Sequence, residues 1–422
     1  MERGSVSSLS TDSFSRILDF VTSEDAYHLF LTGNQRAIDL LKRSLHTFDV
    51  SYGGKRHWKW PSLISSFPRL YRVSMRPTHP FGVGYMEGVD LKDVADTLHE
   101  VELCIGNGFW AFICDTATGL PMPSNELSAR YPHITSLNLS SMDPKLAPHH
   151  IALTENRRAV FALPLLALKI SGLPYTTEDI CLLPRSLTIL ELQVATESQD
   201  WSLAHFPPNL QKLALSGLTS YRVITTLPEL VDTVSFMFEN IVKSDTDRFW
   251  SWLRPNLRHL TLSSCPPLDA LSAQLLPQNL QTLVIAPSYV SPDAYAWLPR
   301  KLEKCKISPL SFSSPPTIAI SELPRTLTEL PTLMDVRPHE WKQLPPAMKY
   351  FSIPTEDTEF AGSQYLPELP QNLNALKLGL SAASNVRGIT AWRLRSLMLE
   401  TNGFIGTVSF DVKWKYFQTR TC

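Results

Sequence analysis

Glycine is scarce in this 422-residue sequence, which contains 17 glycines against 33 prolines. The phosphate loops and tight strand-to-helix turns of nucleotide-binding α/β enzymes need glycine. The pair Gly82 and Gly84 stands alone, without the strand–helix context of a dinucleotide-binding loop. This composition argues against a nucleotide-binding enzyme and favours a repeat built on leucine and proline.

An excess of charge of one sign is also absent, since 39 Lys and Arg balance 40 Asp and Glu for a net charge of −1. A whole-chain electrostatic attraction to nucleic acid or to an anionic membrane is therefore excluded. The short run Tyr52–Trp60 mixes basic and aromatic residues, as nucleic-acid patches do. In a neutral chain we interpret it as a linker or an interdomain contact, and we expect neither nucleic acid nor membrane as a partner.

The six cysteines are scattered, and no two have the CxxC spacing of zinc or thioredoxin-type sites. Scattered cysteines in a chain of this length are typical of an intracellular protein with reduced thiols. Residues 1–10 lack the apolar stretch of a secretory signal, and no segment has 18 consecutive apolar residues. We therefore expect no transmembrane helix and a location in the cytoplasm or the nucleus.

Catalytic and metal-binding patterns are equally sparse. The pair His149–His150 has no Cys or carboxylate at ligand spacing, and no Ser/His/Asp order stands out. Cys114 is followed directly by Asp115, unlike the C-x-D motif of bacterial cysteine-type ubiquitin ligases. We expect no catalytic residue, no metal and no cofactor, and hence a non-catalytic protein.

Leucine, by contrast, is abundant, with 62 residues arranged largely in a repeat of the form L-P-x-x-L-x-x-L-x-L. From Pro184 to Pro370 the template advances eight steps over 186 residues, about 23 residues per step. That period lies in the range of leucine-rich repeats, 20–29 residues. The clearest copies of the template begin at Leu183, Phe206, Leu253, Leu276, Leu298 and Leu369.

The template predicts one short parallel strand per repeat. Its last two apolar residues alternate, as on a strand with one buried face, and stacked copies form a continuous leucine column. Proline pre-sets the backbone before the strand and ends whatever precedes it. The residues between copies are expected to form loops, 3₁₀ turns or short helices, with helical spacing clearest in Leu268–Leu276.

On these residues the sequence resembles leucine-rich-repeat proteins over Pro132–Leu399. The usual Asn after the last Leu is irregular, and four copies instead have Asn before the first Leu: Asn209, Asn256, Asn279 and Asn372. The expected fold class is an α/β leucine-rich-repeat solenoid with parallel strands on the concave face and irregular loops and short helices on the convex face. The pairs Leu70–Val73 and Leu98–Val101 fit the template poorly.

The N-terminal region predicts three short helices. Phe14, Ile17, Leu18 and Val21 have helical spacing, Ser23 is the N-cap candidate of a second helix, and Gln35–Leu45 forms a third, amphipathic stretch. The order of apolar residues resembles an F-box, although Ser10 replaces the usual Pro and the usual Trp near Arg36 is missing. An alternative interpretation is a helical cap over the first repeat, which solenoids require.

The F-box resemblance implies a substrate-recognition subunit of a Skp–cullin–F-box ubiquitin ligase, with a Skp-family adaptor, the cullin–RING ligase and an unidentified protein target as partners. The alternative is a leucine-rich-repeat protein-binding scaffold with no role in ubiquitin transfer. The residues that the resemblance assigns to adaptor binding are Leu9, Phe14, Ile17, Leu18, Val21, Asp25 and Leu29.

Target binding is expected on the exposed template positions of the strand face, although the convex loops remain an alternative. The candidates are Thr188, Glu191, Lys212, Arg258, His259, Lys304, Lys306, Lys349, Tyr350 and Lys377. The predicted domains are an F-box-like unit (1–50), a linker with degenerate repeats (51–130), the solenoid (131–400) and a C-terminal cap or tail (401–422). The tail alternates like a strand over Val408–Phe417.

Overall fold

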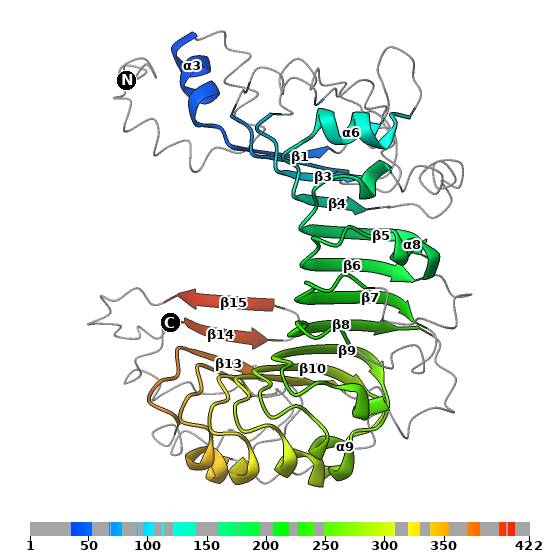
Figure 1. Ribbon diagram of the computed structural model, residues 1–422. Helices are drawn as coiled ribbons and strands as arrows, with labels where there is room; N and C mark the ends of the chain where they lie inside the picture. Colours follow the sequence, from blue (N-terminus) through cyan, green and yellow to red (C-terminus); the bar gives the residue numbers. More distant parts are fainter. Residues whose placement is uncertain are drawn as a thin grey trace, which may run out of the picture. The chain divides into compact units, whose positions relative to one another are not determined.

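The fold was analysed in a computed structural model of the 422-residue chain (Figure 1). The structure describes residues 35–52, 67, 69–77, 91, 96–104, 112–113, 121–140, 159–175, 177–194, 206–218, 227–239, 249–308, 320–329, 338–353, 369–379, 396–401 and 404–409. The chain divides into two compact units, Met1–Gly217 with Pro228–Leu230, and Leu218–Leu227 with Val231–Cys422. Each unit is described by itself below.

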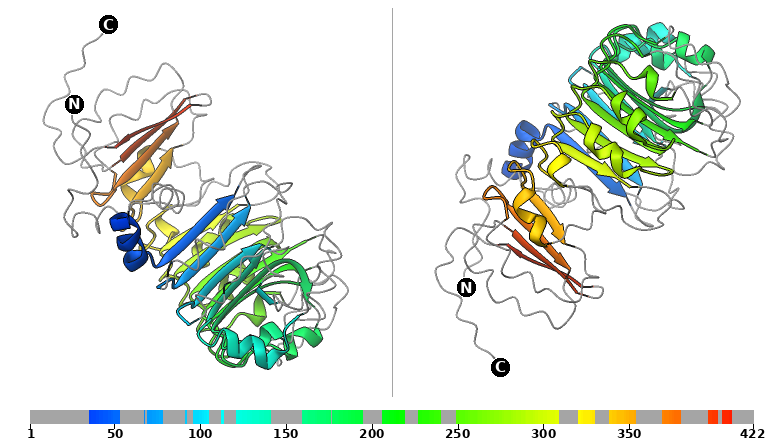
Figure 2. Two further views of the ribbon diagram at one scale, coloured as in Figure 1. Left: turned by 90° about the horizontal axis from the view of Figure 1, so that it is seen from above. Right: turned by 90° about the horizontal axis from the view of Figure 1, so that it is seen from below.

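The first unit contains a run of parallel strands in chain order, each hydrogen-bonded to the next (Figure 1). They are β1 (Thr47–Tyr52), β2 (Arg72–Pro77), β3 (Glu100–Cys104), β4 (Ser136–Ser140), β5 (Ala167–Tyr175), β6 (Ile189–Val194) and β7 (Lys212–Leu218). Helices α3 (Gln35–Ser44), α6 (Ser124–Arg130) and α8 (Thr177–Cys181) lie between or before them. Figure 2 shows α6 and α8 outside the layer of strands.

The second unit continues the same pattern with parallel strands β8 (Thr233–Phe238), β9 (His259–Cys265), β10 (Thr282–Pro287) and β11 (Lys304–Ile307). A further sheet contains β12 (Tyr350–Ile353), β13 (Ala375–Gly379) and β14 (Ser396–Thr401), which are parallel, and β15 (Phe404–Ser409), which is antiparallel to β14. Glu329 forms single parallel bridges to both Lys304 and Tyr350. Between the strands lie η5 (Phe249–Trp252), α9 (Ala270–Gln274), η6 (Pro292–Trp297), η7 (Ile320–Glu322) and η8 (Pro338–Gln343).

The template leucines form the core in register. Leu137, Leu168, Leu190 and Leu213 are register partners on β4 to β7, and each has an exposed fraction of 0%. Burial alternates along the strands, as on β7 and β10. Burying one such leucine contributes about 1.5–3 kcal/mol, so the column is the main source of stability. These parallel, leucine-lined strands are the architecture of a leucine-rich-repeat solenoid and confirm the predicted parallel-strand fold.

The Leu-Pro entry of most described repeats is a tight turn. The carbonyl of its proline accepts a hydrogen bond from the leucine N–H three residues on, at 3.2 Å for Pro184–Leu187 and 3.1 Å for Pro277–Leu280. The leucine before the proline closes the preceding helical turn, since Leu276 donates to the carbonyl of Ala273 at 3.2 Å. Because proline has no N–H and restricts the residue before it, the helical turn stops there and the chain enters the strand.

Two of the asparagines that precede a template leucine link neighbouring repeats through their side chains. Asn279 donates from Nδ2 to the carbonyl of Pro255 in the preceding repeat at 3.1 Å, and Asn372 donates to Pro346 at 3.2 Å. Ser186, at the same template position, donates its hydroxyl to the carbonyl of Leu165 in the preceding repeat at 2.7 Å. These side chains satisfy carbonyls at the turn between repeats and hold neighbouring repeats in register.

The N-terminal expectations are only partly covered. The predicted helix at Gln35–Leu45 is confirmed as α3, whose residues Ile38 and Leu41 are buried. The other two predicted helices, with all seven adaptor-binding candidates, lie outside the described residues, so the three-helix F-box-like unit is not shown. Strand β1 runs across the predicted boundary between residues 50 and 51.

Two doubtful repeats and the C-terminal segment are also clarified. The Val73 and Val101 copies form β2 and β3, so the parallel run begins well before residue 131. At the other end, β15 ends at Ser409, and the rest of the predicted strand Val408–Phe417 lies outside the described residues. The predicted domain boundaries themselves stay a prediction.

Candidate protein-binding surface

The strand side chains that alternate with the buried columns point away from the core and form what we call the open face. Among the open-face side chains that the structure describes in the first unit, six are charged, namely Arg72, Glu100, Glu102, Lys169, Glu191 and Lys212. All six take part in ion pairs between neighbouring repeats. Register across the parallel strands therefore decides which charges meet.

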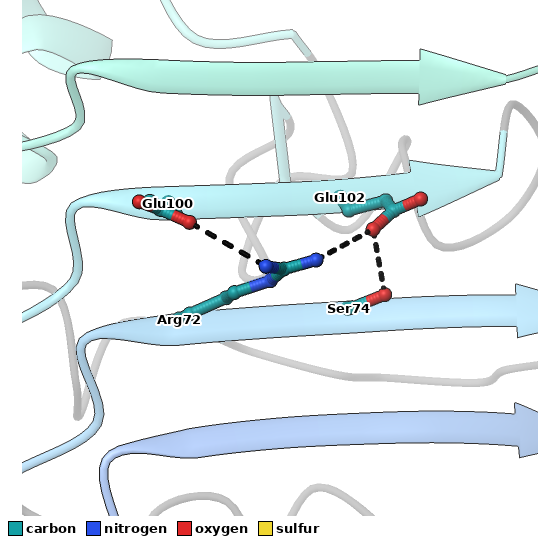
Figure 3. A network of polar contacts seen from close by, with 4 residues as sticks. All are labelled: Arg72, Ser74, Glu100 and Glu102. Carbon is teal, nitrogen blue, oxygen red and sulfur yellow. Dashed lines mark hydrogen bonds and ion pairs between the residues drawn. The ribbon is translucent and has the colours of Figure 1, made fainter. Parts of the chain in front are cut away.

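Arg72 is the centre of the first group of contacts (Figure 3). Its guanidinium lies 3.8 Å from the carboxylate of Glu100, its register partner on β3, and 3.3 Å from Glu102. The Ser74 hydroxyl donates to the same Glu102 oxygen at 2.8 Å, and this serine is only 1% exposed. One arginine thus contacts two carboxylates from the neighbouring strand.

Glu191 is the centre of the second group of contacts. Lys169, its register partner on β5, lies 3.2 Å from the carboxylate, and Lys212 on β7 donates to it at 2.6 Å. Burial acts to raise the pKa of Glu191, but the hydrogen bond from Lys212 and the charge of Lys169 outweigh it, so the pKa lies below its ordinary value. Two lysines for one carboxylate leave an excess of one positive charge.

These ion pairs organise the surface more than they stabilise the fold. The side chains of Arg72, Lys169 and Lys212 are 37–40% exposed, and exposed pairs contribute only about 0.2–1 kcal/mol each. What they do provide is a fixed position for each charge on neighbouring strands. The first unit thus presents a mixed-charge surface in which no single sign dominates.

The open face of the second unit differs in the lysines whose side chains the structure describes. His259 and Thr282, register partners on β9 and β10, contact each other at 3.1 Å. Lys304 and Lys306 on β11 are exposed, as is Lys349 at the entry of β12. Within the part of the chain that the structure describes, these three lysines form no ion pair.

The sequence-predicted target residues fall into three groups. Glu191, Lys212, His259, Lys304, Lys306 and Tyr350 lie on the described strands at open-face positions. Thr188, Arg258 and Lys349 lie one residue before a strand, where Thr188 donates its hydroxyl to the carbonyl of Leu166 at 3.0 Å. Lys377 lies on β13, but its side chain is not among those described. Their role in binding stays a prediction.

Four charged residues of the open face were missed in the sequence. Arg72, Glu100 and Glu102 belong to the poorly fitting copies, where valine replaces leucine in the column. Lys169 lies between Leu168 and Ile170, a pair that fits the template well, so its position could have been read from the repeat. The contacts themselves could not, because loops of different length separate the strands.

Two further surface features lie away from the open-face positions. At the strand-entry edge of the first unit, the rings of Tyr71 and His99 stack at 4.8 Å, and His99 and His133 stack at 5.7 Å. In the second unit, helices α9 and η6 leave Leu271 and Trp297 exposed to 72% and 50%. The apolar surface on these helices keeps the convex side open as an alternative binding surface.

The two buried cysteines of the second unit have thiols that resist deprotonation. Burial raises the pKa of the Cys265 and Cys305 thiols to about 12 each, so both stay protonated at neutral pH. Among the residues with described positions, no group of three His, Cys, Asp or Glu could hold a metal ion. In the same set, no helix is long and apolar enough to cross a membrane.

Comparison with known proteins adds little to this picture. No family model matches any part of the chain, and the F-box-like residues 9–45 are no exception. No curated protein matches the chain in sequence. Among solved structures it is similar to the leucine-rich repeat-containing protein LegL7 from Legionella pneumophila, with 11% identity and a TM-score of 0.30. The match covers 75% of this chain and 89% of that chain. At this TM-score the likeness carries no argument, and the fold rests on the repeats and their strands.

Proposed function

We propose that this chain is a non-catalytic protein-recognition subunit whose open face binds a partner protein. The observation that carries the proposal is the open face itself, where charged side chains stand at regular strand positions and are fixed by contacts such as Arg72–Glu102. Repeat solenoids use such extended strand surfaces for binding. A surface of mixed charge suits recognition of a protein, in which both signs alternate, more than recognition of a uniform polyanion.

We further propose that residues 9–45 dock a Skp-family adaptor and so bring the bound partner to a cullin–RING ubiquitin ligase. The support is the F-box-like order of Leu9, Phe14, Ile17 and Leu18 in the sequence. Helix α3 and β1 are separated by only two residues, so this segment is joined directly to the solenoid. In this role the chain would raise the concentration of target near the ligase without doing bond chemistry.

A scaffold without any role in ubiquitin transfer is the second candidate. The observation in its favour is the packing of α3, whose Leu41 is completely buried, and of Leu45 directly after it, which is 9% exposed. A helix packed in this way serves as a cap for the first repeat, whether or not an adaptor binds. The two candidates share the open-face binding surface and differ only in the use of residues 9–45.

The binding surface is tested by selecting peptides from a phage-displayed random library on the full chain. Two open-face variants are compared with the wild type, Arg72→Glu/Lys212→Glu and Lys304→Glu/Lys306→Glu. We expect the selected peptides to bind at least one of them more weakly than the wild type. The matched control is Lys301→Glu/Lys342→Glu, at exposed positions outside the strands, which changes the charge equally. Peptides that bind both open-face variants as well as the wild type would overturn the proposed surface.

The adaptor role is tested by co-purification of the full chain with a Skp-family adaptor. We expect the wild type to retain the adaptor and Ile17→Asp/Leu18→Asp to lose it, while the circular dichroism of the solenoid stays unchanged. The control is Ile189→Asp, an open-face substitution far along the chain from residues 9–45. A wild-type chain that retains no adaptor contradicts the ubiquitin role and leaves the scaffold.

A further inference from the structure

We propose that Lys304, Lys306 and Lys349 form a docking site for an acidic segment of the partner protein. This inference rests on the proposed function, because it assigns a chemical class to what the open face of the second unit binds. We call these three residues the lysine cluster. The proposal stands on their placement, on the absence of ion pairs from them among the described residues, and on the charges around them.

Two of the three lysines share one strand, and backbone hydrogen bonds place Lys349, one residue before β12, near them. Lys304 and Lys306 are two residues apart on β11 and therefore point to the same face, about 6–7 Å apart along the strand. The backbone N–H of Thr328 donates to the carbonyl of Glu303, and the N–H of Lys349 donates to the carbonyl of Thr328, each at 2.8 Å. Lys349 therefore lies two repeats away from Glu303, the residue before Lys304. With rungs spaced by about 4.8 Å, the cluster fits under one short extended segment.

The lysine cluster differs in its contacts from Arg300, Arg325 and Lys301 of the same unit. Arg300 donates to the carbonyls of Glu322 and Ala296, Arg325 donates to that of Gln343, and Lys301 donates to the Asn279 side chain. Within the described ranges of the second unit, Lys304, Lys306 and Lys349 have neither a hydrogen bond nor an ion pair through their ammonium groups. In the first unit, Lys169 and Lys212 are already neutralised in part by Glu191.

The neighbouring charges favour a protein segment over nucleic acid. Glu303 and Glu329 are exposed beside the lysines, and Glu329 pairs by its backbone with both Lys304 and Tyr350. A phosphate backbone carries negative charge at every step and would meet these two carboxylates unfavourably. A peptide can place its carboxylates over the lysines and a neutral residue over Glu329. Val284, half-buried in register with Lys306, offers an apolar contact beside them.

The test is fluorescence anisotropy of the full chain with labelled peptides of roughly ten residues, long enough to cross three rungs. The probes are a peptide of alternating Glu and Val, the same peptide with Lys in place of Glu, and a single-stranded DNA oligonucleotide. We expect the acidic peptide to bind, and binding to weaken about tenfold in Lys304→Glu/Lys306→Glu and by a smaller factor in Lys304→Gln/Lys306→Gln. Lys301→Glu/Lys342→Glu serves as the control and should bind like the wild type.

Several outcomes would overturn the proposal. They are equal binding of the acidic peptide by wild type and Lys304→Glu/Lys306→Glu, tighter binding of the Lys-containing peptide, and tighter binding of the DNA. The library selection separates this failure from failure of the proposed function. If selected peptides are not acidic but still lose affinity for the open-face variants, the open face binds partners and only the acidic-segment assignment is wrong.

Discussion

At the scale of single residues, Glu191 shows how the solenoid fixes its surface charges. The carboxylate lies between Lys169 and Lys212, which come from the strands on either side. The lysine contacts outweigh burial and hold the pKa of Glu191 below its ordinary value of 4.5. A carboxyl with a lowered folded-state pKa stabilises the protein above its unfolded pKa, and this contribution disappears as the pH falls through the folded pKa.

Glu191→Gln should therefore lower the free energy of unfolding at pH 7 by less than about 1 kcal/mol, the range of partly exposed ion pairs. The difference between variant and wild type should shrink as the pH falls below 4.5. Urea unfolding over this pH range measures it. Glu303→Gln, at an exposed carboxylate without an ion pair among the described residues, is the control. A difference that grows toward low pH would contradict the assigned sign.

At the scale of single elements, the short helices between the strands depend on their ends. Helix α9 has only five residues, and the Asp269 carboxylate accepts a hydrogen bond from the Ser272 N–H at 2.8 Å. Hydrogen bonding to Ser272 holds the pKa of Asp269 below its ordinary value. A helix of this length gains little from propensity alone, so its cap and its contact with η6 matter more.

Asp269→Ala should cost about 1 kcal/mol of stability, the usual value for loss of an N-cap side chain. Asp293→Ala is the matched control, because Asp293 lies in the first turn of η6, whose N-cap makes no side-chain hydrogen bond. Thermal unfolding of both variants makes the comparison. Equal losses for the two substitutions would show that the cap of α9 contributes nothing particular.

The elements also show what a sequence can and cannot predict here. Strands β6, β7 and β9 to β11 follow from the Leu-Pro template, because its period fixes both the turn and the buried positions. Strand β1 was not predicted, since Phe48 takes the place of a template leucine. The contact of Arg72 with Glu102 joins residues 30 positions apart and depends on the length of the loop between them, which no local pattern encodes.

At the scale of the whole molecule, the buried leucine column and the proposed binding surface lie on opposite faces of the same strands. The column through Leu168, Leu190 and Leu213 is buried completely, whereas the alternating positions stay open. In a repeat protein each unit is stabilised mainly by its neighbours. Changes on the open face should consequently alter binding without unfolding the chain.

Neighbouring residues of β6 provide a matched test of this division. Leu190→Ala should lower the free energy of unfolding by about 2–5 kcal/mol, the cost of a large core deletion. Ile189→Ala, at a half-buried open-face position, should cost clearly less. Urea unfolding of the two variants gives the comparison. Equal losses would mean that the two faces of β6 are packed alike.

The most direct test of the open face as the binding surface is lysine footprinting by acetylation and mass spectrometry, with and without a library-selected peptide. Lys304 and Lys306 lie on the open face of β11, and Lys301 and Lys342 lie at exposed positions outside the strands. The account predicts that the bound peptide slows acetylation of Lys304 and Lys306 severalfold and leaves Lys301 and Lys342 unchanged. Protection of Lys301 or Lys342, with Lys304 and Lys306 fully reactive, would contradict it.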